Sequence, residues 1–242
     1  MPSSHDLSVA SYNIHKGVGT DRRRDLARTA AVISEIGADI LALQEADTRF
    51  GTRTGLLDLE SLRRDLGLIA VPLDGVGVAH GWHGNLLLVR NALVQKVHQI
   101  ALPGFEPRGA LVTDLVIRGQ PLRVVNAHLG LLPASRVAQA RALLNRLGNL
   151  EARPTLLMGD LNEWSSKSAA LKALGEHFTI GHPRPSFPSR YPMLALDRMM
   201  LSPHGELLDI ATHDSLLARR ASDHLPITAK LRLAARQGGH AP

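Results

Sequence analysis

Two short segments of the chain place a carboxylate beside a second polar side chain where an apolar run begins or ends. Asp160 and Asn162 follow one such run, and Asp223 and His224 precede the last one before the carboxyl terminus. Open sheets bind ligands beyond their strand ends, so acids in these places lie in a cleft more often than in a core. The four side chains predict acid–base chemistry at the edge of a sheet.

The same arrangement recurs earlier in the chain. Asn13, Glu45 and His128 each stand at the end of a short apolar run. Both halves of the chain also contain a helical pattern followed by an apolar strand that ends in an acid, Glu45 in one half and Asp160 in the other. This repetition predicts a pseudo-symmetric core of two sheets with one shared catalytic edge.

Cleavage of a phosphate ester requires a hard cation with oxygen ligands and an activated water. Mg²⁺ typically takes only one or two protein carboxylates and leaves its other positions to water and substrate, a requirement that Glu45 and Asn13 meet. Asp160 is the candidate base toward water. Asn162, which we expect on the same side of an extended segment, is the candidate for holding the phosphate or the nucleophile.

His224 is the candidate for stabilising or protonating a reacting oxygen. A histidine in that role needs a partner that fixes the orientation of its ring, and a carboxylate is the usual one. Asp197 is the best candidate, because an acid that enters the apolar strand 196–201 has no other evident partner.

Each of these residues also has a purely structural interpretation. Asp160 and Asp223 can be turn or helix-cap residues. Asn13 can satisfy backbone groups at a strand end, and His128 can be a hydrogen-bonded core histidine. Lys16 can bind a substrate phosphate as a point charge or can be a surface lysine, and both interpretations stay open. Taken together, the residues favour the chemical interpretation.

Seven motifs, in order, resemble the endonuclease/exonuclease/phosphatase superfamily, which has the deoxyribonuclease I-like fold. The resemblance extends over about residues 7–233, and seven motifs in order are far more specific than any one of them. Three narrower segments, 11–17, 107–111 and 187–192, are similar to compact bacterial members and to the domain linked with lipid remodelling of glycosyl-phosphatidylinositol anchors. The seven motifs cover residues 11–13, 43–45, 108–109, 126–129, 159–162, 196–198 and 222–224.

The resemblance implies a fold and a reaction. The fold is a four-layer α/β/β/α sandwich of two mixed, mainly antiparallel sheets. The reaction is phosphoester hydrolysis that depends on Mg²⁺ or Mn²⁺. In that family the residues matching Asn13 and Glu45 hold the metal, with the residue matching Asp223 close by.

The resemblance also implies roles for the remaining residues. The residue matching Asp160 is the water-activating base, and the one matching Asn162 assists it. The residues matching His128 and Arg108 contact the phosphate. In the same family, the residue matching Asp197 orients the histidine that matches His224.

Apolar periodicity predicts the elements that position these side chains. Arg22 to Ile36 has helical spacing and is followed by Gly37, a plausible helix cap. A proline-rich loop over 181–188 interrupts the later strands. The remaining predicted helices cover about 58–67 and 134–150, and the predicted strands cover 7–14, 40–44, 85–89, 94–100, 110–117, 122–127, 155–158, 196–201, 207–211 and 226–233.

Length and composition predict one domain. The 242 residues are 44% hydrophobic and 21% charged, values typical of a globular protein with a sizeable core. We expect a single domain over 1–242, with a core at about 7–233 and a tail at 234–242. The chain contains no cysteine, which excludes disulfides and thiolate zinc sites. We expect a cytoplasmic monomer without stable membrane insertion.

The net charge of +6 favours an anionic substrate. Our leading hypothesis is a metal-dependent phosphodiesterase or phosphatase whose substrate is a small molecule, a lipid head group or a nucleic acid. One alternative is a nuclease that cuts DNA or RNA with the same site. An alternative of another class is a non-catalytic protein that binds nucleic acid or anionic lipid through its basic surface, with salt-sensitive binding and no turnover.

Overall fold

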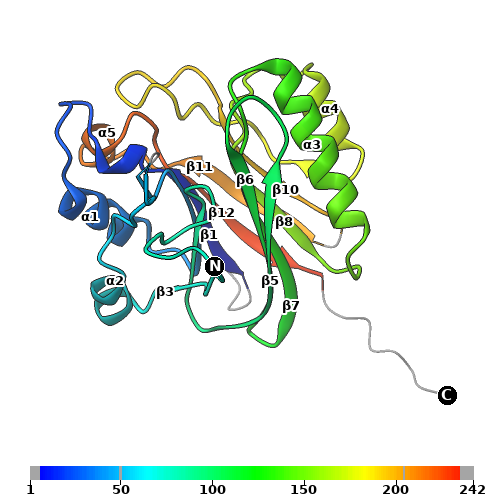
Figure 1. Ribbon diagram of the computed structural model, residues 1–242, viewed down its shortest axis with the longest axis horizontal. Coiled ribbons are helices and arrows are strands. Elements are labelled where there is room, and N and C mark those ends of the chain that lie inside the picture. Colours follow the sequence, from blue (N-terminus) through cyan, green and yellow to red (C-terminus); the bar gives the residue numbers. More distant parts are fainter. Residues whose placement is uncertain (1–5, 49–50, 204, 235–242) are drawn as a thin grey trace.

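Two six-stranded sheets stacked face to face form the centre of the protein (Figure 1). The computed structural model describes residues 6–48, 51–203 and 205–234, so all of the expected tail except Ala234 lies outside the described residues. The first sheet has the order β11 (Gly205–Thr212), β12 (Ile227–Leu233), β1 (Leu7–Asn13), β2 (Ile40–Gln44), β4 (Leu86–Val89), β3 (Ile69–Ala70). The second has the order β5 (Ala92–Leu102), β6 (Arg108–Ile117), β7 (Gln120–His128), β8 (Thr155–Asp160), β10 (Asp197–Leu201), β9 (Thr179–Ile180).

Each sheet contains one parallel pair of strands among antiparallel neighbours. The pairs are β1 with β2 and β7 with β8, and each pair is joined by a helix. All other neighbours in the two sheets are antiparallel. The predicted mixed, mainly antiparallel sheets are therefore confirmed. Because the strands of a parallel pair end at the same edge, β1, β2, β7 and β8 bring their last residues to one side of the molecule.

Helices cover the outer face of each sheet and complete the predicted four-layer sandwich. Those over the first sheet are α1 (Leu26–Ile36), α2 (Leu59–Leu66) and α5 (Ala218–Ala221), which share a buried cluster with β1 and β2. Those over the second sheet are α3 (Pro133–Gly148) and α4 (Ala169–Gly175), which pack on β7 and β8. A third cluster fills the space between the sheets, so both sheets share one core.

Local capping corrects one predicted helix boundary and accounts for one helix that was not predicted. The helix expected from Arg22 begins only at Leu26, because the Asp25 side chain accepts a hydrogen bond from the Arg28 N–H and caps the helix there. Arg22 itself has a left-handed backbone. In the same way Ser168 caps α4, a short helix that the apolar pattern did not predict. None of the helices in the described ranges is long and apolar enough to cross a membrane.

Buried amide side chains join the two sheets just below their shared edge. Gln44 Nε2 donates to Asn126 Oδ1 at 2.8 Å, and Asn126 Nδ2 donates to the carbonyl oxygens of Leu43 and Leu86. Both amides are fully buried, and an unpaired buried amide costs about 1–3 kcal/mol. These bonds therefore favour a single relative placement of β2 and β7.

Strands β7 and β8 lie so close together at Gly159 that one added methyl group there should destabilise the protein. A Cβ at Gly159 would lie 1.9 Å from the carbonyl oxygen of Ala127, and the Gly159 φ of 152° disfavours other residues. We expect Gly159→Ala to lower the free energy of unfolding by about 3 kcal/mol, measured by urea denaturation. Gly148→Ala is the matched control, because a Cβ there meets nothing within 4 Å. It should leave stability unchanged or raise it by up to about 1 kcal/mol, and equal effects of the two variants would contradict the prediction.

Candidate active site

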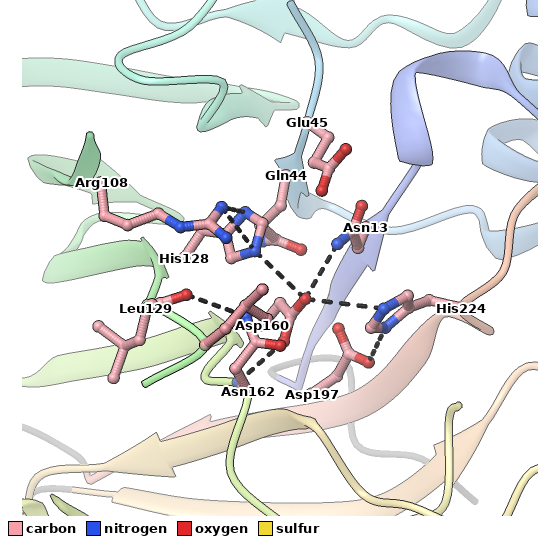
Figure 2. Close-up of polar contacts among 12 residues, drawn as sticks. Asn13, Gln44, Glu45, Arg108, His128, Leu129, Asp160, Asn162, Asp197 and His224 are labelled. Atoms are coloured by element: carbon pink, nitrogen blue, oxygen red, sulfur yellow. Dashed lines mark hydrogen bonds and ion pairs between the residues drawn. The ribbon is translucent and has the colours of Figure 1, made fainter. Parts of the chain in front are cut away.

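Three neighbouring strands of the second sheet place polar side chains side by side. His128 at the end of β7, Asp160 at the end of β8 and Asp197 at the start of β10 are register partners across the sheet. Partners in register project to the same face of a sheet, so these three side chains share one face at its edge. Asn13, at the end of β1, faces them from the first sheet (Figure 2). The structure thus brings together residues that are up to 184 positions apart (197 minus 13).

The Asp160 carboxylate lies at the centre of this group (Figure 2). Its Oδ2 accepts a hydrogen bond from Asn13 Nδ2 at 2.9 Å. The same oxygen lies 3.4 Å from Nε2 of His128 and 3.7 Å from Nε2 of His224. Asp160 is 1% exposed, so its charge depends on these donors rather than on bulk water.

Asp197 lies behind His224 on the side away from Asp160. Its Oδ2 is 2.8 Å from Nδ1 of His224 and accepts a hydrogen bond from the Ser186 hydroxyl at 2.5 Å. The Phe187 ring packs on the His224 ring with centroids 4.9 Å apart. These contacts fix the imidazole and leave its Nε2 directed toward Asp160.

The two histidines beside Asp160 have opposite pKa shifts. Burial lowers the pKa of His128 to about 3, and the nearby Arg108 charge acts in the same direction. Burial alone would also lower the pKa of His224, but the charges of Asp197 and Asp160 outweigh it and raise that pKa to about 10. At neutral pH His128 is therefore neutral and His224 is an imidazolium.

Asn162 reaches the site by a turn and not by an extended segment. Strand β8 ends at Asp160, and Asn162 has a left-handed φ of 51°. Its backbone N–H donates to Asp160 Oδ1 at 2.9 Å, and its side-chain Nδ2 donates to the Leu129 carbonyl at 2.9 Å. The expected extended geometry was wrong because an asparagine two residues after an aspartate favours this local turn. The turn supplies a further donor to the central carboxylate.

Arg108, the first residue of β6, points its guanidinium at His128. Its Nη1 lies 3.0 Å from both ring nitrogens of His128. Its other nitrogens, Nε and Nη2, donate to Glu106 Oε2. The guanidinium is therefore held at the mouth of the site by a carboxylate that no sequence motif had marked.

Oxygen ligands gather on the side of the site formed by the first sheet. The Glu45 carboxylate follows β2 and contacts the ammonium group of Lys16. Burial alone would raise the pKa of Glu45, but the hydrogen bond and the charge of Lys16 lower it. Asn13 Oδ1 accepts one hydrogen bond, from the His15 N–H, and Asp223 Oδ1 lies 3.5 Å from His15 Nδ1. Two carboxylates and an amide oxygen form a donor set that fits a hard divalent cation such as Mg²⁺ or Mn²⁺, and the Glu45 carboxylate is paired with the Lys16 ammonium.

A second group could also hold an ion. Ligand atoms of Asp160, Asp197 and His224 lie within 4.8 Å of one another, and this is the one such group of three found within the described residues. However, the raised pKa of His224 means that both of its ring nitrogens carry protons at neutral pH. A protonated imidazole has no lone pair for a metal, so an ion at this group would have to displace the proton of His224.

Several residues at this edge have left-handed backbones although they are not glycine. They are His15, Lys16, Glu45 and Asn162, with φ between 45° and 56°. A left-handed backbone costs a residue other than glycine about 1–3 kcal/mol, and it persists only where the surrounding structure imposes it. Conformations of this kind occur often at functional sites.

A basic cleft opens from the site. Glu45, Asp47 and His128 line it. Lys16, Arg108 and Arg53 line it as well, and Arg53 Nη1 lies 3.1 Å from Nδ1 of His83. The cleft is suited to an anionic substrate.

Comparison with known protein families shows which family the chain belongs to. The model of the Endonuclease/Exonuclease/phosphatase family matches residues 10–224. The chain belongs to this family. Its members are hydrolases that act on phosphoester bonds and depend on divalent metals.

Other proteins extend the family relationship. The chain is 29% identical over 245 residues to the uncharacterized protein YbhP of Escherichia coli (strain K12), covering 94% of this chain and 96% of that protein. The endonuclease/exonuclease/phosphatase from Beutenbergia cavernae superposes with a TM-score of 0.73 at 23% identity, over 96% of this chain and 72% of that one. D. rerio TDP2 complexed with a single-strand DNA product superposes with a TM-score of 0.69 at 18% identity, over 94% and 99%. These two structures show that the deoxyribonuclease I-like fold is shared.

Sequence reasoning missed several residues of this edge. Ser186 and Glu106 bond to Asp197 and Arg108, and Arg53 and His83 line the cleft. None of them stands at the end of an apolar run, which was the signal used for the others. For Glu106, its position two residues before Arg108 was the only usable hint.

The raised pKa of His224 predicts how stability depends on pH. The folded protein binds this proton more tightly than the unfolded chain, whose histidine has a pKa of 6.5. The stabilisation is complete below pH 6.5 and is lost as the pH rises toward about 10. Urea denaturation in EDTA should therefore show a smaller fall in unfolding free energy over that range for His224→Gln than for the unmodified protein. The exposed His182, replaced by Gln, is the control and should leave the pH profile unchanged; identical profiles for all three proteins would contradict the assignment.

Proposed function

We propose that the protein is a divalent-metal-dependent phosphoesterase that hydrolyses a phosphodiester or a phosphomonoester by in-line attack of water. The observation that carries this proposal is the buried Asp160 carboxylate, directed at His128 and His224 and bonded to Asn13. This arrangement provides a carboxylate that can act as a base. It also provides one neutral and one charged histidine that can donate hydrogen bonds to a phosphoryl group. Membership of a phosphoester hydrolase family supports the same reaction.

Asp160 is the base in this proposal. At neutral pH His224 already carries its proton, so it cannot accept another from water. The ring nitrogens of His128 lie 3.0 Å from Arg108 Nη1, and its Nε2 lies 3.4 Å from Asp160, so its ring is already engaged by these two groups. Asp160, whose Oδ1 is fixed by the Asn162 N–H, is left as the group that accepts the proton of the attacking water. Asn162 assists by orienting this carboxylate.

The cationic groups act on the phosphate. The His224 imidazolium, oriented by Asp197, donates from Nε2 to a phosphate oxygen and offsets the charge that develops there. Arg108 and His128 contact a second oxygen of the same group from the opposite side. Lys16 contacts the phosphate after leaving Glu45, which links substrate binding to metal binding.

Glu45, Asn13 and Asp223 would hold the metal ion. When bound, a divalent ion neutralises charge on the phosphate oxygens and favours attack on phosphorus. The mixture of two carboxylates and one amide oxygen is a donor set for Mg²⁺ or Mn²⁺ and not for a metal that prefers sulfur or nitrogen.

A nuclease is the second candidate, with the same residues in the same roles. The net charge of +6 and the basic cleft favour it, as does the fold shared with a TDP2 that was crystallised with single-strand DNA product. The short chain is equally compatible with a small phosphate ester or a lipid head group as the substrate.

Replacing the proposed base should abolish turnover without unfolding the protein. We expect Asp160→Asn and His224→Ala to reduce metal-dependent hydrolysis at least about a thousandfold, because each removes a group that acts in the transition state. The measurement is a panel of monoesters, diesters, phospholipids, RNA, and single- and double-stranded DNA, each with Mg²⁺ and with Mn²⁺. Circular dichroism checks that the variants are folded.

The matched control is Asp209→Asn, an exposed aspartate on β11 whose left-handed φ of 52° also suits asparagine. It should retain full activity. Unchanged turnover in folded Asp160→Asn would contradict the mechanism. Salt-sensitive binding of nucleic acid or anionic lipid with no turnover of any substrate would instead support a non-catalytic binding protein.

The metal position can be tested separately from activity. Glu45→Gln should weaken Mn²⁺ binding at least about tenfold, since it removes a charged ligand. Lys16→Met should make Mn²⁺ binding several-fold tighter, because it removes a competing positive charge from the Glu45 carboxylate. Isothermal titration calorimetry measures both affinities without substrate. An unchanged affinity in Glu45→Gln would place the ion elsewhere.

A further inference from the structure

Exposed apolar side chains are concentrated along the edge that carries the site. In the described part of the chain, eleven large hydrophobic side chains are exposed, and seven of them lie on loops next to the site-bearing strand ends. Single exposed hydrophobic residues are ordinary, but a concentration at a functional edge marks an interaction surface. The seven are Phe105, Leu131, Leu132, Trp164, Tyr191, Met193 and Leu216.

Four of these residues form what we call the apolar rim, namely Phe105, Leu131, Leu132 and Trp164. Phe105 lies in the β5–β6 turn, the two leucines lie between β7 and α3, and Trp164 lies after β8. Figure 1 shows the β5–β6 turn and the start of α3 together at the upper edge of the molecule. The exposed fractions run from 48% for Leu132 to 91% for Phe105, so a large part of each side chain is in water.

Buried ion pairs hold the backbone of the apolar rim in place. Glu106 Oε1 accepts from the Leu131 N–H at 2.7 Å, and Arg136 Nη1 donates to the Leu131 carbonyl at 2.6 Å. Arg136 also pairs with Glu163, the residue before Trp164, at 3.1 Å, and both charged side chains are almost fully buried. The exposure of the rim is therefore imposed by the fold.

The apolar rim is joined directly to the phosphate-binding side of the site. Glu106, which holds Leu131 through Oε1, also holds Arg108 through Oε2. Arg108 in turn lies 3.0 Å from the His128 ring. A molecule whose phosphate is bound at Arg108 would thus have its neighbouring atoms beside exposed leucine and phenylalanine side chains.

The loops of the apolar rim carry no exposed carboxylate. Their two acids, Glu106 and Glu163, are paired with Arg108 and Arg136. Lys167 is exposed in the same region. This absence of negative charge removes the usual repulsion between a protein and an anionic surface.

The opposite flank of the site combines apolar and basic side chains. We call Arg190, Tyr191, Leu216 and Arg220 the basic rim; Tyr191 is 76% exposed and Leu216 87%. Arg220 lies 3.5 Å from the Asp21 carboxylate, whereas Arg190 donates to the carbonyl of Thr20. The loop that carries Arg190 is fixed to the site, because the Ser189 N–H donates to the carbonyl of Asp223 at 2.7 Å. The site thus lies between two rims that both expose apolar groups.

We infer that this edge docks on the surface of an anionic phospholipid bilayer, with both rims in the interface and the catalytic cleft facing the lipid head groups. Interfacial binding requires apolar side chains that enter the acyl boundary and cations that meet anionic head groups, and the two rims supply both. The inference rests on the proposed function only in naming lipid phosphoesters as the substrate class.

The chemistry of the exposed side chains favours lipid over nucleic acid. Four of the seven are aliphatic, namely Leu131, Leu132, Met193 and Leu216. Bases stack best on aromatic rings, whereas acyl chains take leucine and methionine side chains out of water. Single-stranded DNA is therefore the competing outcome in the test and not the expected one.

Trp164 allows docking to be observed directly. The chain has two tryptophans, so Trp82→Phe leaves Trp164 as the sole emitter. With vesicles of equal parts phosphatidylcholine and phosphatidylglycerol, in EDTA to prevent turnover, its emission should shift to the blue and the protein should co-sediment. Binding should weaken in high salt and with phosphatidylcholine alone.

The double variant Leu131→Ser with Leu132→Ser should weaken vesicle binding at least about tenfold and leave hydrolysis of a soluble phosphate ester unchanged. Leu93→Ser is the matched control, since Leu93 is 67% exposed at the far end of β5 and should bind like the unmodified protein. The docking proposal is overturned if the protein does not bind the vesicles, or if the double variant and Leu93→Ser lose vesicle binding equally. It is also overturned if the Trp164 emission shifts with single-stranded DNA and not with vesicles. Because binding is measured without turnover, an inactive protein that still docks would reject only the proposed function.

Discussion

The structure of the site depends on a buried carboxylate that needs donors from both sheets. Asp160 belongs to the second sheet, and its Oδ2 accepts from Asn13 at the end of a strand in the first sheet. A buried charge without such partners would cost several kcal/mol. The two sheets must therefore stack so that β1 and β8 end together, and the Gln44–Asn126 bond just below has the same requirement. One face-to-face arrangement meets both.

Burial and the charged groups around the site set the protonation of the two histidines before any substrate arrives. His224 lies between Asp160 and Asp197 and keeps its proton, while His128 is equally buried but faces Arg108 and loses it. The difference comes from the charges around each ring and not from the histidines themselves. The left-handed backbones at Glu45 and Asn162 lie at the same edge, as such conformations often do at functional sites.

Outside the site, hydrogen bonds and ion pairs of buried side chains hold the neighbouring loops in place. Glu106 connects Arg108 to the backbone of Leu131, and Arg136 connects that backbone to Glu163. A substrate that contacts these loops would therefore meet a surface of fixed shape. On that surface the cationic phosphate site and the exposed apolar side chains hold fixed positions relative to each other. Preorganised surfaces of this kind lose little conformational entropy on binding.

The amino-acid sequence by itself determined the mixed sheets, the four layers and the set of polar residues at strand ends. Apolar periodicity, a local property of the chain, predicted the strands and the polar residues at their ends, and the resemblance of the motifs to a known family implied the mixed sheets and the four layers. Only the tertiary structure decided that Lys16 contacts Glu45, that Ser186 bonds to Asp197, and that Asn162 turns back on Asp160. It also decided where the apolar loops lie relative to the site. Such contacts join residues as far apart as Asn13 and Asp160, 147 positions along the chain, and their geometry exists only once two sheets have packed their shared core.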